Sequence, residues 1–159
     1  MSSDSQAEGA AVRFPPPLVP VIGLAAGELL HRFVWPLPLP VTGVLRVALA
    51  ALLLAAGIAL ILAAAGLFRK TGQDPKPWKP SPEIISDGVY RFTRNPMYVS
   101  MGLLQAGLGV ALADGWVVAL VPPVWLVIYL IAIRHEEAYL ERKFGGEYQD
   151  YKRAVRRWL

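Results

Sequence analysis

Cysteine is absent from this chain of 159 residues, and charged residues are scarce at 18%. Without cysteine there is no thiolate chemistry, and a disulfide-stabilised secreted module is excluded. A disordered protein would need more charge and fewer apolar residues than the 55% hydrophobic content of this chain. Soluble domains carry roughly 25% charged residues, so a mean hydropathy of +0.42 indicates that lipid covers much of the surface of one domain.

Uncharged runs predict where the chain crosses a membrane. Residues 47–67 carry no charge and are long enough, as a helix, to cross a hydrocarbon core of roughly 30 Å. Two later runs, separated by a break at Asp114, predict a transmembrane helical hairpin, in which Pro122 and Pro123 predict a kink. The weakest segment carries His31 near its end. We therefore expect an all-α integral membrane domain, residues 1–159, with about four transmembrane helices at residues 18–34, 45–68, 97–113 and 116–133.

The distribution of basic residues predicts the topology. Thirteen of the 16 Lys and Arg residues lie in residues 69–96 or 134–159. By the positive-inside rule both segments are cytoplasmic, together with a flexible N-terminus at residues 1–17, in an inner or cell membrane. The net charge of +4 is then explained by topology, so no nucleic-acid partner is expected. Anionic lipid headgroups would still be attracted to this surface.

Two clusters of polar residues lie at the predicted cytoplasmic face. Arg94 and Asn95 precede Pro96, which is typical of a helix start whose free N–H groups suit an anion. Glu136 and Glu137 follow the fourth span on a helical continuation at residues 134–159. The alternative interpretations are an interfacial anchor and a solvated helix exit.

Taken together, the two clusters could hold a small zwitterion, with Arg94 near its carboxylate and Glu136 or Glu137 near its ammonium. The amino-acid end of S-adenosylmethionine is such a group, and methyl transfer needs alignment and desolvation more than a protein nucleophile. His31 and His135 have no third ligand near them in the sequence, so no metal site is expected.

Two motifs carry a resemblance to a known family. The first is Gly88, Val89 and Tyr90, followed by Arg94, Asn95, Pro96, Met97 and Tyr98. The second is Glu136 and Glu137, followed by Phe144, Gly145, Tyr148 and Tyr151. In both motifs the chain resembles the isoprenylcysteine carboxyl methyltransferase and phospholipid methyltransferase superfamily of integral membrane enzymes.

The resemblance implies a cytoplasmic S-adenosylmethionine site built from the loop before the third span and the C-terminal helix. The candidate cofactor-binding residues, with Arg94 and Glu137 added from their chemistry, are Pro82, Glu83, Ile84, Ile85, Tyr90, Arg94, Asn95, Pro96, Met97, Tyr98, Glu136 and Glu137. Arg134 is implied to handle a substrate carboxylate, and Asn95 stands where the family usually has a histidine. Arg134 and Asn95 are the candidate catalytic residues, although asparagine does not titrate near neutral pH.

Three functions stay open at the level of sequence. The first is methyl transfer to a lipophilic small molecule or lipidated substrate, whose acceptor group is a prenylcysteine or isoprenoid carboxylate, a phospholipid amine or a thiol. The second is an NADPH-dependent reductase, because sterol reductases resemble the same superfamily, and the third is a non-catalytic four-helix membrane protein. The oligomeric state is open as well, since small residues would permit close helix packing within one chain or between two: Gly102, Ala106, Gly107 and Gly109.

Overall fold

The structure is a computed structural model, and it describes residues 9–12 and 14–159. The described residues form helices, and their β-structure is limited to an isolated bridge between Pro38 and Asp114. The chain divides into two compact units. Unit 1 holds the described residues up to Pro15, Leu60–Met97 and Tyr129–Leu159, and unit 2 holds Pro16–Ala59 and Tyr98–Ile128.

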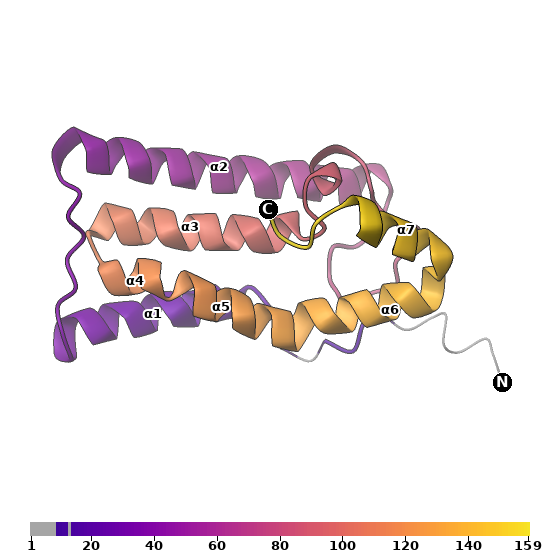
Figure 1. Cartoon of the computed structure of the whole chain (residues 1–159), viewed down its shortest axis with the longest axis horizontal. Coiled ribbons are helices and arrows are strands. Elements are labelled where there is room, and N and C mark those ends of the chain that lie inside the picture. The colour runs from indigo at the N-terminus through magenta and orange to yellow at the C-terminus, as the bar shows by residue number, and fades with distance from the viewer. Residues whose placement is uncertain (1–8, 13) are drawn as a thin grey trace. The chain divides into compact units, whose positions relative to one another are not determined.

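Helices cover all four predicted apolar segments (Figure 1). Their bounds are α1 at Leu18–Phe33, α2 at Gly43–Lys70, α3 at Pro96–Leu112, α4 at Gly115–Ala119 and α5 at Val121–Ile128. Two helical stretches, α2 and the longer run Gly115–Phe144, are long and apolar enough to cross a membrane. Only 17% of the most apolar window of α2 is buried, so its side chains are free to contact lipid. Membrane crossing by α1 and α3 stays a prediction.

Asp114 begins α4 within unit 2. Its carboxylate accepts hydrogen bonds from the backbone N–H groups of Trp116 at 2.8 Å and Val117 at 3.2 Å, as expected of an N-cap. Ala113 before it has a φ of 56°, the left-handed conformation that turns the chain sharply. His31 of α1 lies 3.3 Å from the same carboxylate, Nδ1 to Oδ1. The predicted break between the two spans is therefore present.

The helix is interrupted at Leu120, two residues before Pro122, because α4 ends at Ala119 and α5 begins at Val121. A helix interrupted in lipid leaves carbonyl groups that need another donor. The two prolines remove the usual donors to the carbonyls of Val118 and Ala119, and at the neighbouring Val117 the carbonyl accepts from Nε2 of Gln105, on α3, at 3.0 Å. The Gln105 side chain is 1% exposed, so protein packing satisfies this carbonyl.

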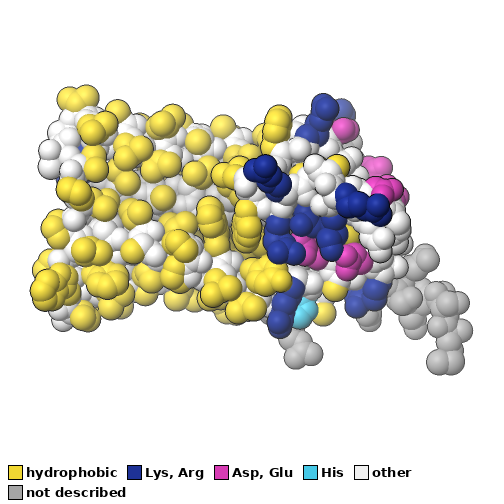
Figure 2. Space-filling model, viewed as in Figure 1, with side chains coloured by type: hydrophobic (Ala, Val, Ile, Leu, Met, Phe, Trp, Pro, Cys, Tyr) yellow, Lys and Arg dark blue, Asp and Glu magenta, His cyan; other side chains and the backbone are white. Residues whose placement is uncertain are grey.

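Glycines let the helices of unit 2 approach closely within the chain. A Cβ on Gly102 would lie 2.4 Å from Nε1 of Trp125, and one on Gly107 would lie 2.9 Å from Leu54. The same Trp125 nitrogen donates to the carbonyl of Tyr98 at 3.0 Å. The two glycines are therefore used for packing inside one chain. On the face shown in Figure 2, the side chains of unit 2 are almost all hydrophobic.

Unit 1 carries most of the charge. It contains the end of α2, an irregular loop at residues 71–87, and four further helices: the 3₁₀-helix η1 at Gly88–Arg91, the π-helix η2 at Tyr129–Ile133, α6 at Arg134–Phe144 and α7 at Gly146–Ala154. The helix α6 directly continues η2, as the sequence predicts for the stretch after the fourth span. Figure 2 shows blue and magenta side chains gathered over this unit.

The beginning of the described chain packs on the loop of unit 1. The N–H of Ala10 donates to the carbonyl of Pro77 at 2.9 Å, and Ala10 and Val12 are buried. A Cβ on Gly9 would lie 2.2 Å from the backbone of Trp78, so only glycine fits there. The prediction of a flexible N-terminus concerns residues 1–17, of which residues 1–8 and 13 lie outside the described residues.

Candidate functional site

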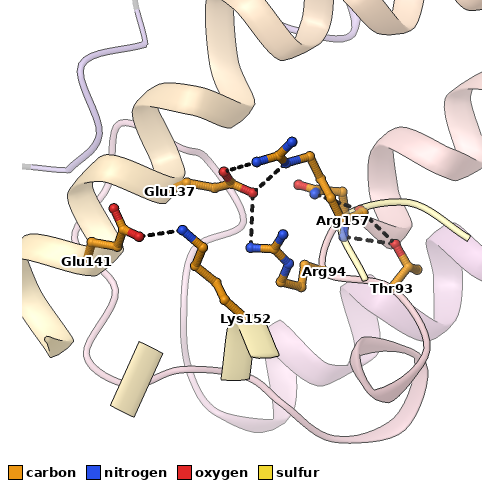
Figure 3. Close-up of polar contacts among 7 residues, drawn as sticks. Thr93, Arg94, Glu137, Glu141, Lys152 and Arg157 are labelled. Carbon is orange, nitrogen blue, oxygen red and sulfur yellow. Dashed lines mark hydrogen bonds and ion pairs between the residues drawn. The ribbon is translucent and has the colours of Figure 1, made fainter. Parts of the chain in front are cut away.

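The candidate site is a buried ionic cluster of unit 1 centred on Glu137 (Figure 3). Glu137 lies in the first turn of α6, Arg94 lies two residues before α3, and Arg157 follows α7. The positive φ of Gly145, 54°, allows the sharp turn between α6 and α7. That turn brings the C-terminal segment back to α6, so that three distant parts of the sequence meet.

Glu137 binds two guanidinium groups. Arg157 does so with both oxygens, Nε to Oε1 at 2.9 Å and Nη2 to Oε2 at 2.9 Å. Arg94 contacts only one, Nη1 to Oε1 at 3.1 Å. The side chains of Glu137 and Arg94 are 12% and 9% exposed. A bidentate pair of this kind is among the stronger hydrogen-bonded contacts in proteins, and the bonds to Glu137 raise the pKa of Arg157 above its usual value.

Backbone contacts bind the C-terminal segment to the turn before α3. The carbonyl of Arg157 accepts hydrogen bonds from Thr93 Oγ1 at 3.1 Å and Asn95 Nδ2 at 2.9 Å. The N–H of Arg94 donates to the carbonyl of Arg156 at 2.9 Å. Asn95 is buried, and its side chain here acts as a donor that holds the turn in place.

Tyrosines surround the cluster. The hydroxyl of Tyr151 donates to the carbonyl of Tyr90 at 2.8 Å, and the ring of Tyr90 packs edge-on against Phe68 with centroids 6.1 Å apart. Burial, and then the charge of Glu136, raises the pKa of Tyr90. Burial raises the pKa of Tyr148 to about 12; Glu137 adds to this and Arg94 opposes it. These hydroxyls are therefore neutral near pH 7.

The loop before η1 is anchored to α6 by one side chain. The N–H of Ser81 donates to the hydroxyl of Tyr139 at 3.1 Å, and Lys143 Nζ donates to the same oxygen at 3.3 Å. The predicted cofactor-binding loop follows this anchor, with Pro82 and Glu83 exposed and with Ile84 and Ile85 half-buried.

The structure brings some of the predicted site residues together. Arg94, Asn95 and Glu137 meet at the cluster. Arg134 is exposed, and its Nε donates to Nε2 of its neighbour His135 at 3.4 Å. Tyr98 belongs to unit 2. The remaining predicted residues are Glu136, half-buried, and Pro96 and Met97 in the first turn of α3.

The sequence predicts that Glu136 or Glu137 lies near the ammonium of a ligand, which stays a prediction, and in the structure Glu137 contacts two arginines. The sequence missed Thr93 and Arg157. The sequence assigns Arg157 to the cytoplasmic basic residues and does not predict its pairing with Glu137, because a contact across 20 residues depends on the turn at Gly145. The arginine-rich end of the chain was the one available signal.

An anionic ligand group fits the donors that the cluster leaves unused. Among the described residues, Nε and Nη1 of Arg94 are buried without a hydrogen-bond acceptor, since the contact of Nη1 with Glu137 is an ion pair of poor hydrogen-bond geometry. Buried donors of this kind need a partner. A carboxylate such as that of S-adenosylmethionine would provide one. No group of three His, Cys, Asp or Glu side chains that could hold a metal ion occurs in the part of the chain that the structure describes.

Comparison with known proteins identifies relatives. The model of the phospholipid methyltransferase family matches residues 45–147, about two thirds of the chain. That range includes Arg94, Asn95 and Glu137 and ends before Arg157. An uncharacterized protein of Haemophilus influenzae is 62% identical over 34 residues, which are 21% of this chain and 54% of that protein. The match therefore spans about half the length of this relative.

Proposed function

Because the chain belongs to the phospholipid methyltransferase family, we propose that it transfers a methyl group from S-adenosylmethionine to a lipophilic acceptor. The observation that carries the proposal is the buried cluster of Arg94, Glu137 and Arg157, which joins the two motifs and leaves donors of Arg94 without acceptors. The cofactor, when bound, would supply a methyl group on its sulfonium sulfur, and that methyl would pass to a nucleophile of the acceptor as the carbon–sulfur bond breaks and S-adenosylhomocysteine leaves.

The chain's own residues bind and orient rather than react. Arg94 has two buried donors without acceptors, which we propose meet the carboxylate. The carboxylate of Glu136, half-buried on α6, is proposed to meet the ammonium. Asn95 keeps the turn before α3 in place through its bond to the carbonyl of Arg157. Arg134, exposed at the start of α6, is proposed to meet an acceptor that carries a carboxylate. Such positioning provides much of the rate enhancement of a direct displacement.

We place the site at the cytoplasmic surface of an inner or cell membrane that α1, α2, α3 and residues 116–133 cross. The charge distribution supports this orientation, since the 13 basic residues of the two predicted cytoplasmic segments all belong to unit 1. The acceptor is then amphiphilic, with its tail in the bilayer and its head at the site. Membrane lipids are the expected partners.

Binding measured on the purified chain in detergent tests the proposal. Calorimetric titration with S-adenosylmethionine should give saturable binding, and NADPH should give none. When S-adenosylmethionine labelled with tritium in its methyl group is added together with a membrane extract, the label should pass to lipids of that extract. Binding of NADPH alone would instead support a reductase, and binding of neither would support a non-catalytic membrane protein.

A series of acceptors with one headgroup and increasing tail length tests lateral entry. Activity should rise with tail length, because a longer tail partitions into the bilayer next to the helices. A preference for acceptors without a tail would contradict lateral entry and would leave the methyltransferase assignment intact.

A further inference from the structure

The two arginines of the cluster hold Glu137 unequally. Arg157 takes both carboxylate oxygens in aligned hydrogen bonds, whereas Arg94 reaches one oxygen at 3.1 Å without such alignment. Figure 3 shows Glu137 between the two guanidinium groups. Arg157 is therefore the principal partner of Glu137, and Arg94 is the secondary one.

The cluster carries more positive than negative charge. Two guanidinium groups and one carboxylate carry a net charge of +1, and the Arg94 side chain is 9% exposed. The neighbouring carboxylate of Glu141 is itself paired with Lys152. A buried charge with unfilled donors is costly unless an anion meets it. Were Arg157 absent, Glu137 would be free to turn both oxygens toward Arg94 and neutralise it.

We infer that Arg157 is a positioning residue of the cofactor site: it occupies Glu137, so that Arg94 stays available to the carboxylate of S-adenosylmethionine. The inference rests on the proposed function and deepens it. The family match ends at residue 147, so it assigns nothing to this arginine. Arg157 touches no ligand in this account, because it acts through Glu137 and Arg94.

The backbone of Arg157 supports the same role. Its carbonyl accepts from both Thr93 and Asn95, the residues on either side of Arg94. Its guanidinium also lies over the ring of Tyr129, 5.0 Å from the centroid, a favourable cation–π contact. Arg157 therefore pairs with Glu137 through its side chain and holds the turn that carries Arg94 through its backbone carbonyl.

The test compares a single with a double variant of the full chain in detergent. Arg157→Gln should weaken binding of S-adenosylmethionine about ten- to hundredfold, since Glu137 then neutralises Arg94. Adding Glu137→Gln removes the competing carboxylate, so the double variant should bind within about threefold of the wild type. A merely structural arginine predicts the opposite order, with the double variant at least as weak as the single one, and that result would overturn the inference.

A second ligand tests whether the carboxylate of S-adenosylmethionine is the group that Arg94 binds. Decarboxylated S-adenosylmethionine lacks the group that Arg94 is inferred to bind, so Arg157→Gln should leave its affinity within about threefold of the wild type. An equal loss for both ligands would overturn the inference. Arg153→Gln is the matched control, because Arg153 is 74% exposed and pairs with Asp150 at the surface.

Thermal unfolding without ligand shows whether the variants fold. If Arg157→Gln unfolds, Arg157→Lys replaces it in the test, because lysine keeps the positive charge. The ratio of its affinities for S-adenosylmethionine and the decarboxylated ligand should stay within about threefold of the wild-type ratio. A larger fall in that ratio would overturn the inference. A wild type that binds no S-adenosylmethionine would overturn the proposed function and this inference together, whereas wild-type binding that Arg157→Gln leaves unchanged would overturn this inference alone.

Discussion

Glu136 and Glu137 are adjacent in the chain but have different surroundings. Glu137 is enclosed by two arginines, whereas Glu136 is half-buried and close enough to Tyr90 for its charge to raise the pKa of that hydroxyl. Neighbouring helical positions point about 100° apart, which explains how one carboxylate is an internal counter-ion of two arginines while the other has different neighbours.

Replacing Glu136 tests this division of roles. Glu136→Gln should weaken binding of S-adenosylmethionine by about 1.5–3 kcal/mol, the usual value of a charged hydrogen bond. Glu141→Gln is the control, because Glu141 pairs with Lys152 one turn further along α6, and it should change binding far less. Titration calorimetry measures both, and equal small effects would indicate a solvated helix exit.

The pKa of Tyr148 predicts how stability depends on alkaline pH. Its folded-state pKa is raised to about 12 from a usual value of 10.0. Below pH 10 both states hold the proton; between pH 10 and 12 the unfolded chain loses it while the folded one keeps it. The free energy of unfolding should therefore fall over this window, by at most about 1.4 kcal/mol per pH unit for this group. Chemical unfolding of Tyr148→Phe should show a shallower fall, and parallel curves would contradict the assignment.

At the residue scale, the sequence predicts groups with local signals better than groups paired at a distance. Arg94 and Asn95 stand directly before a helix-starting proline, and Glu137 follows an apolar span, so their positions could be read from neighbouring residues. Arg157 could not, because its partner lies on another helix and the contact depends on the fold of α7.

At the scale of elements, the sequence likewise predicts those helix breaks that have a signal in neighbouring residues. Asp114 is an N-cap residue with a strong local preference, and Pro122 and Pro123 lack backbone donors, so both breaks were predictable. The π-helix at Tyr129–Ile133 was not, because its five residues are ordinary apolar ones. It directly precedes α6 and so affects which side of that helix Glu137 occupies.

Helix packing in unit 2 depends on glycine at one contact in particular. Gly102→Ala should lower the melting temperature in detergent, because the added methyl would lie 2.4–2.5 Å from the ring of Trp125, and overpacking costs about 1–3 kcal/mol. Gly66→Ala is the matched control, since it lies in α2 with no atom within 4 Å of its Cβ. Alanine there should be neutral or slightly stabilising. An equal loss at both positions would contradict the packing argument.

For the whole molecule, the number of membrane crossings decides whether the two motifs can meet one cofactor on one side. The sequence predicts four crossings from hydropathy and charge, and two helical stretches satisfy the length and composition needed. An odd number of crossings between residues 96 and 134 would put the motifs on opposite sides. The hairpin of α3 and the stretch from Gly115 is therefore the part of the topology on which the proposed site depends.

Labelling of single introduced cysteines tests this topology directly, because the natural chain has no cysteine to remove. Ser86→Cys, Gln149→Cys and Thr42→Cys each replace an exposed residue. A membrane-impermeant maleimide added to intact cells should label only Thr42→Cys, since the basic segments that hold the other two are retained on the cytoplasmic side. Permeabilised cells provide the control, in which all three should react. Labelling of Gln149→Cys but not Ser86→Cys in intact cells would place the motifs on opposite sides, and a cofactor site shared by Arg94 and Glu137 would then be impossible.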